Sequence, residues 1–408
     1  MSIWIINHAG GTPYHGPNMR SYYLAREFVR RGNRTAIVSA SFFHKYINPP
    51  KVQAGNGHEV IDGVDYFWTG VPRYNGRGGG QVLNQLVFTA RAFGHVVQLP
   101  MARPRVVIAS SPHPFVSLPA WRVAQRFSCP FVFEIRDLWP LAIRELTGWP
   151  SWHPYIAMLS WAERFGCTKA DHIVSVKPGD IQYLSQRFGT TTEGFSWIPN
   201  GHPCEDSPPS FKTYITWPKG DFTLGYVGAL SKYYALETLL KAVGVLQSGN
   251  LNIQLVIVGD GALRSSLEKI VQQMRLKNVF FAGAVPKQAV PEILRHFDVC
   301  YLGLAAVSIN RFGVSCNKLY DYMYASVPVI MSAAVPREFD PVAEAACGIS
   351  VPAEEPEAVA HAVQQFRDMP RSYRIQLGKN GRKYLERRHS FKHIADTYLE
   401  CIASLRKQ

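Results

Sequence analysis

The sequence predicts an α/β protein built from two successive Rossmann-like domains. The chain has 408 residues, which is more than one hydrophobic core usually supports, so two domains are expected. Short apolar runs rich in β-branched residues alternate with helix-like segments, a pattern typical of parallel βαβ units. The alternation starts again after a proline-rich segment that begins near residue 206. These observations together predict two successive α/β sheets.

The first domain is expected over residues 1–205. Its predicted strands are 3–7, 35–39, 106–110, 131–135 and 172–175. Residues 206–218 contain several prolines and polar side chains, which favour a hinge over a core element.

The second domain is expected over residues 219–384. Its predicted strands are 222–227, 253–258, 279–282, 299–302 and 327–331. The apolar residues from about 385 to 408 recur with the period of a helix. We expect this C-terminal helix to pack back on the first domain.

Composition indicates an ordered protein of a reducing compartment. Hydrophobic residues make up 47% and charged residues 18% of the chain, as in folded globular domains. The sequence contains no apolar run of the length that a spanning helix needs, and Met1 to Asn7 reads as a strand. The seven cysteines form no Cys-x-x-Cys pair, so neither a disulfide framework nor a zinc site is indicated. We therefore expect a cytoplasmic location.

Positive charge is concentrated near the N-terminus. The net charge is +14, and residues 1–130 hold 14 Lys and Arg against 4 Asp and Glu. Nucleic acid, an anionic bilayer and a phosphorylated substrate would each suit such a field. A basic surface that only aids solubility is the alternative.

A glycine pair follows the first predicted strand. Gly10 and Gly11 precede a helical stretch, so the backbone there can approach a ligand closely. Arg20, at the start of that helix, is expected to point at the same ligand. The spacing lacks a full G-x-G-x-x-G motif, and an ordinary strand-to-helix turn would also use glycine.

Charged residues end a buried strand in the run from Phe133 to Pro140. Arg136 and Asp137 follow the predicted strand, at the edge where open α/β sheets bind ligands. The alternative is an ion pair of Arg136 with Asp137 or Glu134 that braces the loop. His113 ends the neighbouring strand and adds a weaker candidate.

The second domain offers another strand, glycine turn and helix. Gly259 and Gly261 follow a predicted strand, and they would let a base or ribose lie against the backbone.

The most informative segment runs from Gly313 to Met323. Ser315, Asn317 and Lys318 lie where a helix is expected to begin, so backbone amides, the helix dipole and an ammonium group would converge on a diphosphate. Asp321 follows one turn later and could accept hydrogen bonds from a ribose. A capped surface helix with an incidental Lys–Asp pair is the alternative.

Taken in order, these motifs resemble the retaining family-4 glycosyltransferases. The resemblance rests on the Gly-Gly loop, Glu-x-Arg-Asp-x-Trp-Pro, Ile-Pro-Asn-Gly, Gly-Tyr-Val-Gly, Val-Gly-Asp-Gly and Ser-x-Asn-Lys-x-x-Asp-Tyr-Met, and it covers nearly the whole chain. The sequence looks most similar to the bacterial branch with the N-acetyl-fucosamine transferases of O-antigen and capsule assembly.

The resemblance implies the GT-B fold, in which two Rossmann-like domains face each other across a cleft. The acceptor would be bound mainly by the first domain and a nucleotide sugar by the second. It implies no metal and no cofactor. Gly10 and Gly11 would face the donor phosphates, and Arg136 and Asp137 the sugar or acceptor. Lys318 and Ser315 would then bind the diphosphate, with Asp321 at the ribose. Lys318, Arg136 and Asp137 are the predicted catalytic residues.

Two departures from the family pattern affect the predicted site. Many family members have two glutamates eight positions apart; here Gly313 and Asp321 occupy these positions. The usual basic pair falls on Ala229 and Tyr234. Lys232 lies nearby in sequence, and Lys318 is the better substitute.

We therefore expect a retaining, metal-independent hexosyltransferase that uses a UDP-sugar, with a UDP-N-acetyl sugar as first choice. The predicted acceptor is a glycan or lipid-diphosphate-linked saccharide of bacterial surface polysaccharide synthesis. No residue stands out as a covalent nucleophile. A sugar-nucleotide epimerase on the same fold and a non-catalytic polyanion-binding protein are the alternatives. The basic strands and recognition helices typical of nucleic-acid binders are lacking.

A lipid-linked acceptor would be reached at the inner face of the plasma membrane. The segment from Gln81 to Phe93 has apolar residues at helical spacing, and Arg91, Arg103 and Arg105 follow. Such a helix could lie at an anionic membrane surface, and an ordinary core helix is the alternative.

Overall fold

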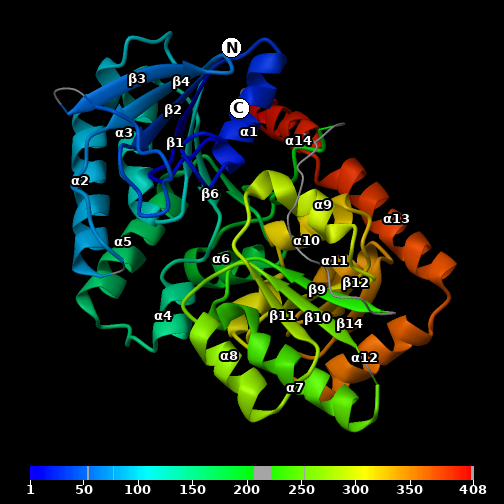
Figure 1. Ribbon diagram of the computed structural model, residues 1–408. Coiled ribbons are helices and arrows are strands. Elements are labelled where there is room, and N and C mark those ends of the chain that lie inside the picture. The colour runs from blue at the N-terminus through cyan, green and yellow to red at the C-terminus, as the bar shows by residue number, and fades with distance from the viewer. Residues whose placement is uncertain (53–54, 77, 206–221, 252, 406–408) are drawn as a thin grey trace. The chain divides into compact units, whose positions relative to one another are not determined.

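The structure is a computed structural model that describes all residues except 53–54, 77, 206–221, 252 and 406–408. It divides into two compact units, Met1–Asn200 with Phe391–Gln408, and Gly201–Ser390 (Figure 1). The hinge predicted at 206–218 lies outside the described residues.

The first unit contains an eight-stranded sheet in the order β3-β4-β2-β1-β5-β6-β7-β8. The strands are β1 (Ser2–Ile6), β2 (Arg34–Ala40), β3 (Asn56–Ile61), β4 (Val64–Thr69), β5 (Val106–Ser110), β6 (Phe131–Ile135), β7 (His172–Ser175) and β8 (Phe195–Trp197). Only β3 pairs antiparallel to its neighbour among these strands. β1, β5, β6 and β7 are buried along their whole length, as parallel strands covered on both faces must be.

Helices cover both faces of this sheet (Figure 1). They are α1 (Arg20–Arg30), α2 (Gly79–His95), α3 (Ser117–Phe127), α4 (Leu141–Thr147), α5 (Pro154–Lys169), α6 (Asp180–Phe188) and α14 (Phe391–Ser404). α1 and α14 contact each other and share one core with the sheet, while α3 contacts both α2 and α5. The C-terminal helix thus packs on the first unit, as predicted.

The second unit contains a six-stranded, wholly parallel sheet in the order β11-β10-β9-β12-β13-β14. The strands are β9 (Thr223–Val227), β10 (Gln254–Val258), β11 (Val279–Gly283), β12 (Val299–Gly303), β13 (Val329–Ser332) and β14 (Gly348–Val351). The helices are α7 (Leu236–Ser248), α8 (Arg264–Gln273), α9 (Val290–Leu294), α10 (Asn317–Tyr324), α11 (Pro341–Glu344), α12 (Pro356–Asp368) and α13 (Arg371–Arg388). Two separate cores lie on the two faces of the sheet, one with α7 and α12 and the other with α9, α10 and α11.

The C-terminal helical segment is two helices and not one. α13 ends at Arg388 and α14 begins at Phe391, so residues 385–388 belong to the second unit. Ser390 between them is extended and pairs with His202, whose amide donates to the carbonyl of His389 at 2.8 Å. This strand-like pairing interrupts the helical hydrogen bonds there, which explains the break.

Every predicted strand is present within about two residues, and four more were not predicted. β3 and β4 form an antiparallel hairpin, and β8 and β14 are short edge strands. Edge strands carry a weak apolar signal because one side lacks a neighbour, which is why the pattern did not show β3, β8 and β14. β4 lies between β3 and β2 and is largely buried, so this reason does not apply to it.

Candidate functional site

The second unit has a topological switch point between β9 and β12. These strands are neighbours in the sheet although β10 and β11 lie between them in sequence. Ligands of open α/β sheets bind at the carboxyl ends of strands at such a point. β9 ends at Val227 and is followed by Gly228, while β12 leads through the 3₁₀ helix Ser308–Phe312 to α10. Gly228 and the start of α10 therefore mark the candidate site.

Lys318 places an ammonium group at this switch point. Its Nζ donates to the hydroxyl of Tyr226 at 2.7 Å and lies 2.8 Å from the ring centroid of Tyr234. Gly228 leaves the space that the lysine stem occupies, because a Cβ there would lie 1.8 Å from Lys318 Cε. Burial lowers the pKa of Lys318 to about 7. The site thus holds a poorly solvated amine whose charged form a bound anion would favour.

Helix α10 begins one residue before Lys318. The side chain of the N-cap residue, Cys316, makes no capping hydrogen bond, so the first amides of this helix are not capped by it. Asn317 is exposed, and Ser315 Oγ lies 3.3 Å from the hydroxyl of Tyr320. Ser315, Asn317 and Lys318 thus lie at the start of α10, and their convergence on a diphosphate stays a prediction.

Asp321 does not pair with Lys318, although the two lie one turn apart. Its carboxylate accepts a hydrogen bond from Lys287 and lies 3.7 Å from His202 Nε2. Burial lowers the pKa of His202 to about 4, so this imidazole is neutral at pH 7. The helix-bracing Lys–Asp pair considered above is absent, because Lys287 is the partner.

The glycines of the β10 turn are explained by their neighbours. A Cβ on Gly259 would lie 1.9 Å from the carbonyl oxygen of Gly228, and one on Gly261 would lie 2.3 Å from that of Leu230. Both glycines let the β10 turn pack against the β9 turn, so close approach of a ligand is not needed to explain them. Lys232 is exposed in the 3₁₀ helix Lys232–Tyr234.

The first unit has its own switch point between β1 and β5. Gly10 lies in the loop after β1, and its amide donates to Ser39 Oγ at 2.9 Å. A Cβ on Gly11 would lie 2.1 Å from the carbonyl oxygen of Pro17. The loop therefore folds tightly on itself, which accounts for Gly11 without a ligand.

Arg20 is engaged within the first unit. Its guanidinium donates twice to Glu134 Oε2, at 3.1 and 2.9 Å, and also to the carbonyl oxygens of Ile198 and Pro199. Both side chains of the Arg20–Glu134 pair are nearly fully buried, at 3% and 2% exposure. The donors of Arg20, which was expected to point at a ligand, hold α1 to β6 in this structure, and its role in donor binding stays a prediction.

An ion pair between Arg136 and Glu134 was one alternative for the loop after this strand. The structure shows that the partner of Glu134 is Arg20 and not Arg136. Ser110 and Tyr398 also donate to the Glu134 carboxylate, at 2.6 and 3.2 Å. Burial alone would raise the pKa of Glu134, but the Arg20 guanidinium and the hydrogen bond from Ser110 lower it overall.

Arg136 and Asp137 lie directly after β6. Nε and Nη1 of Arg136 are buried and have no hydrogen-bond partner in the part of the chain that the structure describes. Asp137 is exposed. Unpartnered buried guanidinium nitrogens are expensive and call for an explanation, and a bound anion would satisfy them.

Two histidines meet at the β1–β5 switch point. The rings of His8 and His113 lie 4.7 Å apart, and His8 Nε2 is 2.6 Å from Asn84 Oδ1. Neither ring nitrogen of His113 has a hydrogen-bond partner within the described ranges, and burial lowers the pKa of this imidazole well below its usual range. From the sequence His113 was only a weaker candidate for the site, because its position after a strand does not reveal which side chains surround it.

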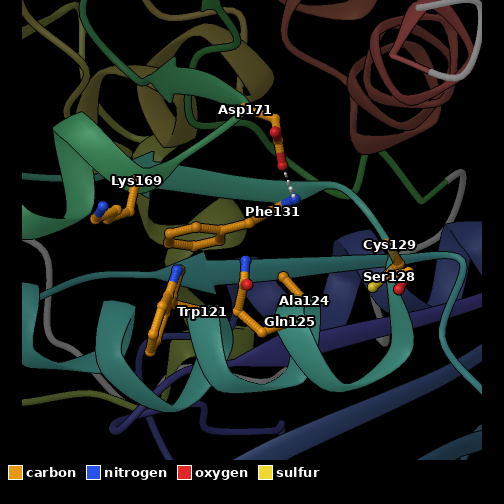
Figure 2. A pocket seen from close by; sticks show the side chains of 8 residues that line it. All are labelled: Trp121, Ala124, Gln125, Ser128, Cys129, Phe131, Lys169 and Asp171. Carbon is orange, nitrogen blue, oxygen red and sulfur yellow. Dashed lines mark hydrogen bonds between the residues drawn. The ribbon is translucent and has the colours of Figure 1, made fainter.

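One cavity of about 210 Å³ lies elsewhere in the first unit (Figure 2). Its lining includes Phe131, the first residue of β6, and Ser128, Cys129, Lys169 and Asp171. These residues lie at the amino ends of the strands, opposite to the edge where open α/β sheets bind their ligands. This cavity is therefore not part of the candidate site.

Two family models match consecutive parts of the chain. The model described as glycosyl transferase 4-like domain matches residues 15–201, and the model described as glycosyl transferases group 1 matches residues 210–384. No curated protein matches the sequence.

Solved structures share the fold at low sequence identity. A sucrose-phosphate synthase from Thermosynechococcus elongatus superposes with a TM-score of 0.75 at 16% identity, covering 100% of both chains. Anabaena HepE in complex with UDP gives 0.66 at 14% identity, covering 99% of this chain and 100% of that one. The lipopolysaccharide outer core galactosyltransferase WaaB gives 0.64 at 14% identity, covering 99% of each.

The likenesses confirm the predicted GT-B fold class of two Rossmann-like units. Together with the two family models, which follow each other along almost the whole chain, they establish the class of enzyme. The chain belongs to the family-4 (group 1) glycosyltransferases, enzymes that use a nucleotide-sugar donor.

Proposed function

We propose that this enzyme transfers a hexosyl residue, with retention and without a metal ion, from a UDP-sugar to a lipid-diphosphate-linked saccharide. A UDP-N-acetyl sugar is the first-choice donor. The acceptor belongs to bacterial surface polysaccharide assembly, such as that of O-antigen or capsule, and is reached at the cytoplasmic face of the membrane.

The observation that carries the proposal is the position of Lys318. Departure of the nucleoside diphosphate develops negative charge, and preorganised cations and helix-start amides stabilise such charge. Lys318 lies beside Gly228 at the switch point, and α10 begins next to it. The Lys318 ammonium group stabilises the leaving diphosphate in place of the family's basic pair, whose positions are Ala229 and Tyr234 in this chain.

The remaining roles follow from this position. Ser315 and Asn317 contact the diphosphate, Asp321 the ribose, and Gly259, Gly261 and Lys232 lie on the donor side. In the first unit, Gly10 and Gly11 face phosphate, and Arg136 and Asp137 act at the sugar or acceptor. The unpartnered nitrogens of Arg136 support an anionic ligand there.

Similar proteins support the choice of donor and acceptor. HepE is solved with UDP and with UDP-glucose, which favours uridine as the base. WaaB is a lipopolysaccharide galactosyltransferase, which favours a lipid-linked saccharide as acceptor. The branch with the N-acetyl-fucosamine transferases is proposed from the order of the six motifs along the chain.

The test has two steps. Melting temperatures are measured with UDP, GDP, ADP and dTDP, and we expect UDP to stabilise the protein most. UDP release from UDP-glucose, UDP-N-acetylglucosamine and UDP-N-acetylgalactosamine is then measured with and without lipid-diphosphate-linked saccharides. Stabilisation by another diphosphate alone would overturn the choice of UDP, and conversion of the donor to an epimer without transfer would overturn the reaction.

A further inference from the structure

Large apolar side chains are exposed in the segment that joins α4 to α5 and on α5 itself. Trp149, Trp152 and Trp161 are 38, 79 and 55% exposed. The inner side of the same segment is well packed, because Ile156 and Leu159 are buried in a cluster with Phe115. The tryptophans are thus outward residues of a rigid element and not part of a poorly packed core.

The outer side of α2 continues this surface. Leu83, Leu86 and Phe93 are 54, 36 and 37% exposed, and their spacing of three and seven residues places them on one side of a helix. Gln85 Oε1 accepts a hydrogen bond from the Tyr155 hydroxyl at 2.7 Å. Because Gln85 lies on α2 and Tyr155 on α5, this hydrogen bond joins the two helices that carry exposed apolar residues.

Aromatic contacts extend the surface toward α3. The rings of Trp161 and Phe165 lie 5.9 Å apart, and those of Phe165 and Trp121 5.6 Å apart. On the other side of α3, the Arg122 guanidinium lies 4.7 Å from the Phe93 ring centroid. The outer helical layer therefore interleaves aromatic rings with arginines.

The charge of this layer has one sign. From Tyr66 to Phe133 the sequence has no Asp or Glu and seven Arg, which covers all of α2 and α3. On α5, Arg164 and Lys169 are exposed, whereas Glu163 is buried and its carboxylate lies 3.3 Å from Arg187. An anionic partner is favoured over a neutral one.

We infer that the outer layer of α2, α3 and the α4–α5 segment, defined by Leu83, Leu86, Trp149, Trp152 and Trp161, docks on an anionic lipid bilayer. Tryptophan is enriched where an apolar ring meets lipid headgroups, and arginines attract anionic lipid. Exposed apolar side chains with basic residues around them mark an interaction surface. The inference deepens the proposed function by assigning the surface that would bring the enzyme to a lipid-linked acceptor.

Flotation of the full chain with phosphatidylcholine vesicles, with and without 30 mol % phosphatidylglycerol, tests the surface. We expect binding to the anionic vesicles that weakens between 50 and 500 mM NaCl. Trp152→Ser with Trp161→Ser should weaken binding by about tenfold or more, since one buried aromatic side chain contributes about 1.5–3 kcal/mol. The matched control is Tyr373→Ser with Ile375→Ser, two residues of the second unit that are 54 and 47% exposed.

Charge reversal gives an independent arm. Arg126→Glu with Arg164→Glu should reduce binding to anionic vesicles by at least about tenfold, because each surface cation changes partitioning by about fivefold. The control is Arg371→Glu with Lys379→Glu, two residues that are exposed on the second unit. This pair of substitutions should not reduce binding to the anionic vesicles.

Each outcome has a meaning. Equal binding to neutral and anionic vesicles, or equal loss in the control pairs, would overturn the inference. Self-association of the wild type in sedimentation, abolished by Trp152→Ser alone, would assign the surface to a second copy instead. The stabilisation of each variant by UDP is also measured. If UDP stabilises none of the variants, the result counts against the proposed function. If UDP still stabilises them and their flotation is unchanged from the wild type, the result counts only against the proposed docking surface.

Discussion

Lys318 is a buried lysine whose amine contacts one hydroxyl and one aromatic face. Replacing it with alanine removes charge from the leaving diphosphate, so we expect kcat to fall together with donor affinity. Removing one such donor typically lowers kcat by about 10²- to 10³-fold. Steady-state kinetics and melting temperatures of Lys318→Ala and of the exposed Lys232→Ala decide this. A folded Lys318→Ala enzyme with unchanged kcat and donor KM would remove Lys318 from the site.

Asp321 is predicted to accept hydrogen bonds from the ribose of the donor, which does not change during the reaction. Asp321→Asn keeps the shape but loses the charge, and it should raise the donor KM by roughly 5- to 150-fold, equivalent to about 1–3 kcal/mol, with little effect on kcat. Because Asp321 also accepts from Lys287, Lys287→Met is the matched control for the loss of that pair. An equal rise in donor KM for both variants would show that the effect comes from losing the Asp321–Lys287 ion pair and not from losing a ribose contact.

The pKa of Lys318, lowered to about 7 by burial, predicts a proton linkage. At pH 8 the free site is largely neutral, and a bound diphosphate favours the charged form, so UDP binding should take up a proton. At pH 6 the lysine is already charged and no uptake is expected. Calorimetric titrations in two buffers of different ionisation enthalpy measure this. Lys318→Met should abolish the uptake at pH 8; uptake that persists would assign the proton to another group.

At the scale of elements, the Arg20–Glu134 pair joins α1 to β6, and Tyr398 adds α14 through the same carboxylate. Three elements from distant parts of the sequence are thus held at one buried point. Arg20 was predicted to contact the donor because it lies after the glycine loop, and sequence spacing contained no sign of a partner 114 residues away.

Removing one member of this pair leaves a buried charge. Glu134→Gln should lower the free energy of unfolding by about 3–5 kcal/mol. The pKa of Glu134 is lowered in the fold, so its stabilisation is complete at neutral pH and is lost as pH falls through the folded pKa. The melting-temperature difference between wild type and variant should therefore shrink on acidification. A constant difference would contradict this origin.

At the scale of the whole molecule, the expected chemistry has no metal ion. Activity should survive EDTA, because Lys318 and the start of α10 are proposed to stabilise the leaving diphosphate in place of Mg²⁺. Initial rates are measured in EDTA and after addition of Mg²⁺ or Mn²⁺. Complete loss in chelator that either ion restores would overturn metal independence. No helix within the described ranges is long and apolar enough to span a bilayer.

The fold class followed from the sequence alone because a buried parallel strand has a recognisable local sequence pattern. Ile3, Val106 and Phe131 begin short apolar runs that are bounded by polar residues and followed by helical periodicity, and each lies in a buried strand. Strands at the sheet edge, such as Asn56–Ile61 with its alternating exposure, have no such local signal.

The tertiary structure alone decided which side chains meet. The sequence indicated Lys318 at a helix start, but Tyr226, its hydrogen-bond partner, is 92 residues away, and the role of Gly228 is visible only once the lysine stem lies against it. The same holds for Arg20 and for the histidine pair His8–His113. Periodicity encodes which face of an element is buried, whereas contacts between elements depend on how the sheet orders its strands, and no local pattern specifies that order.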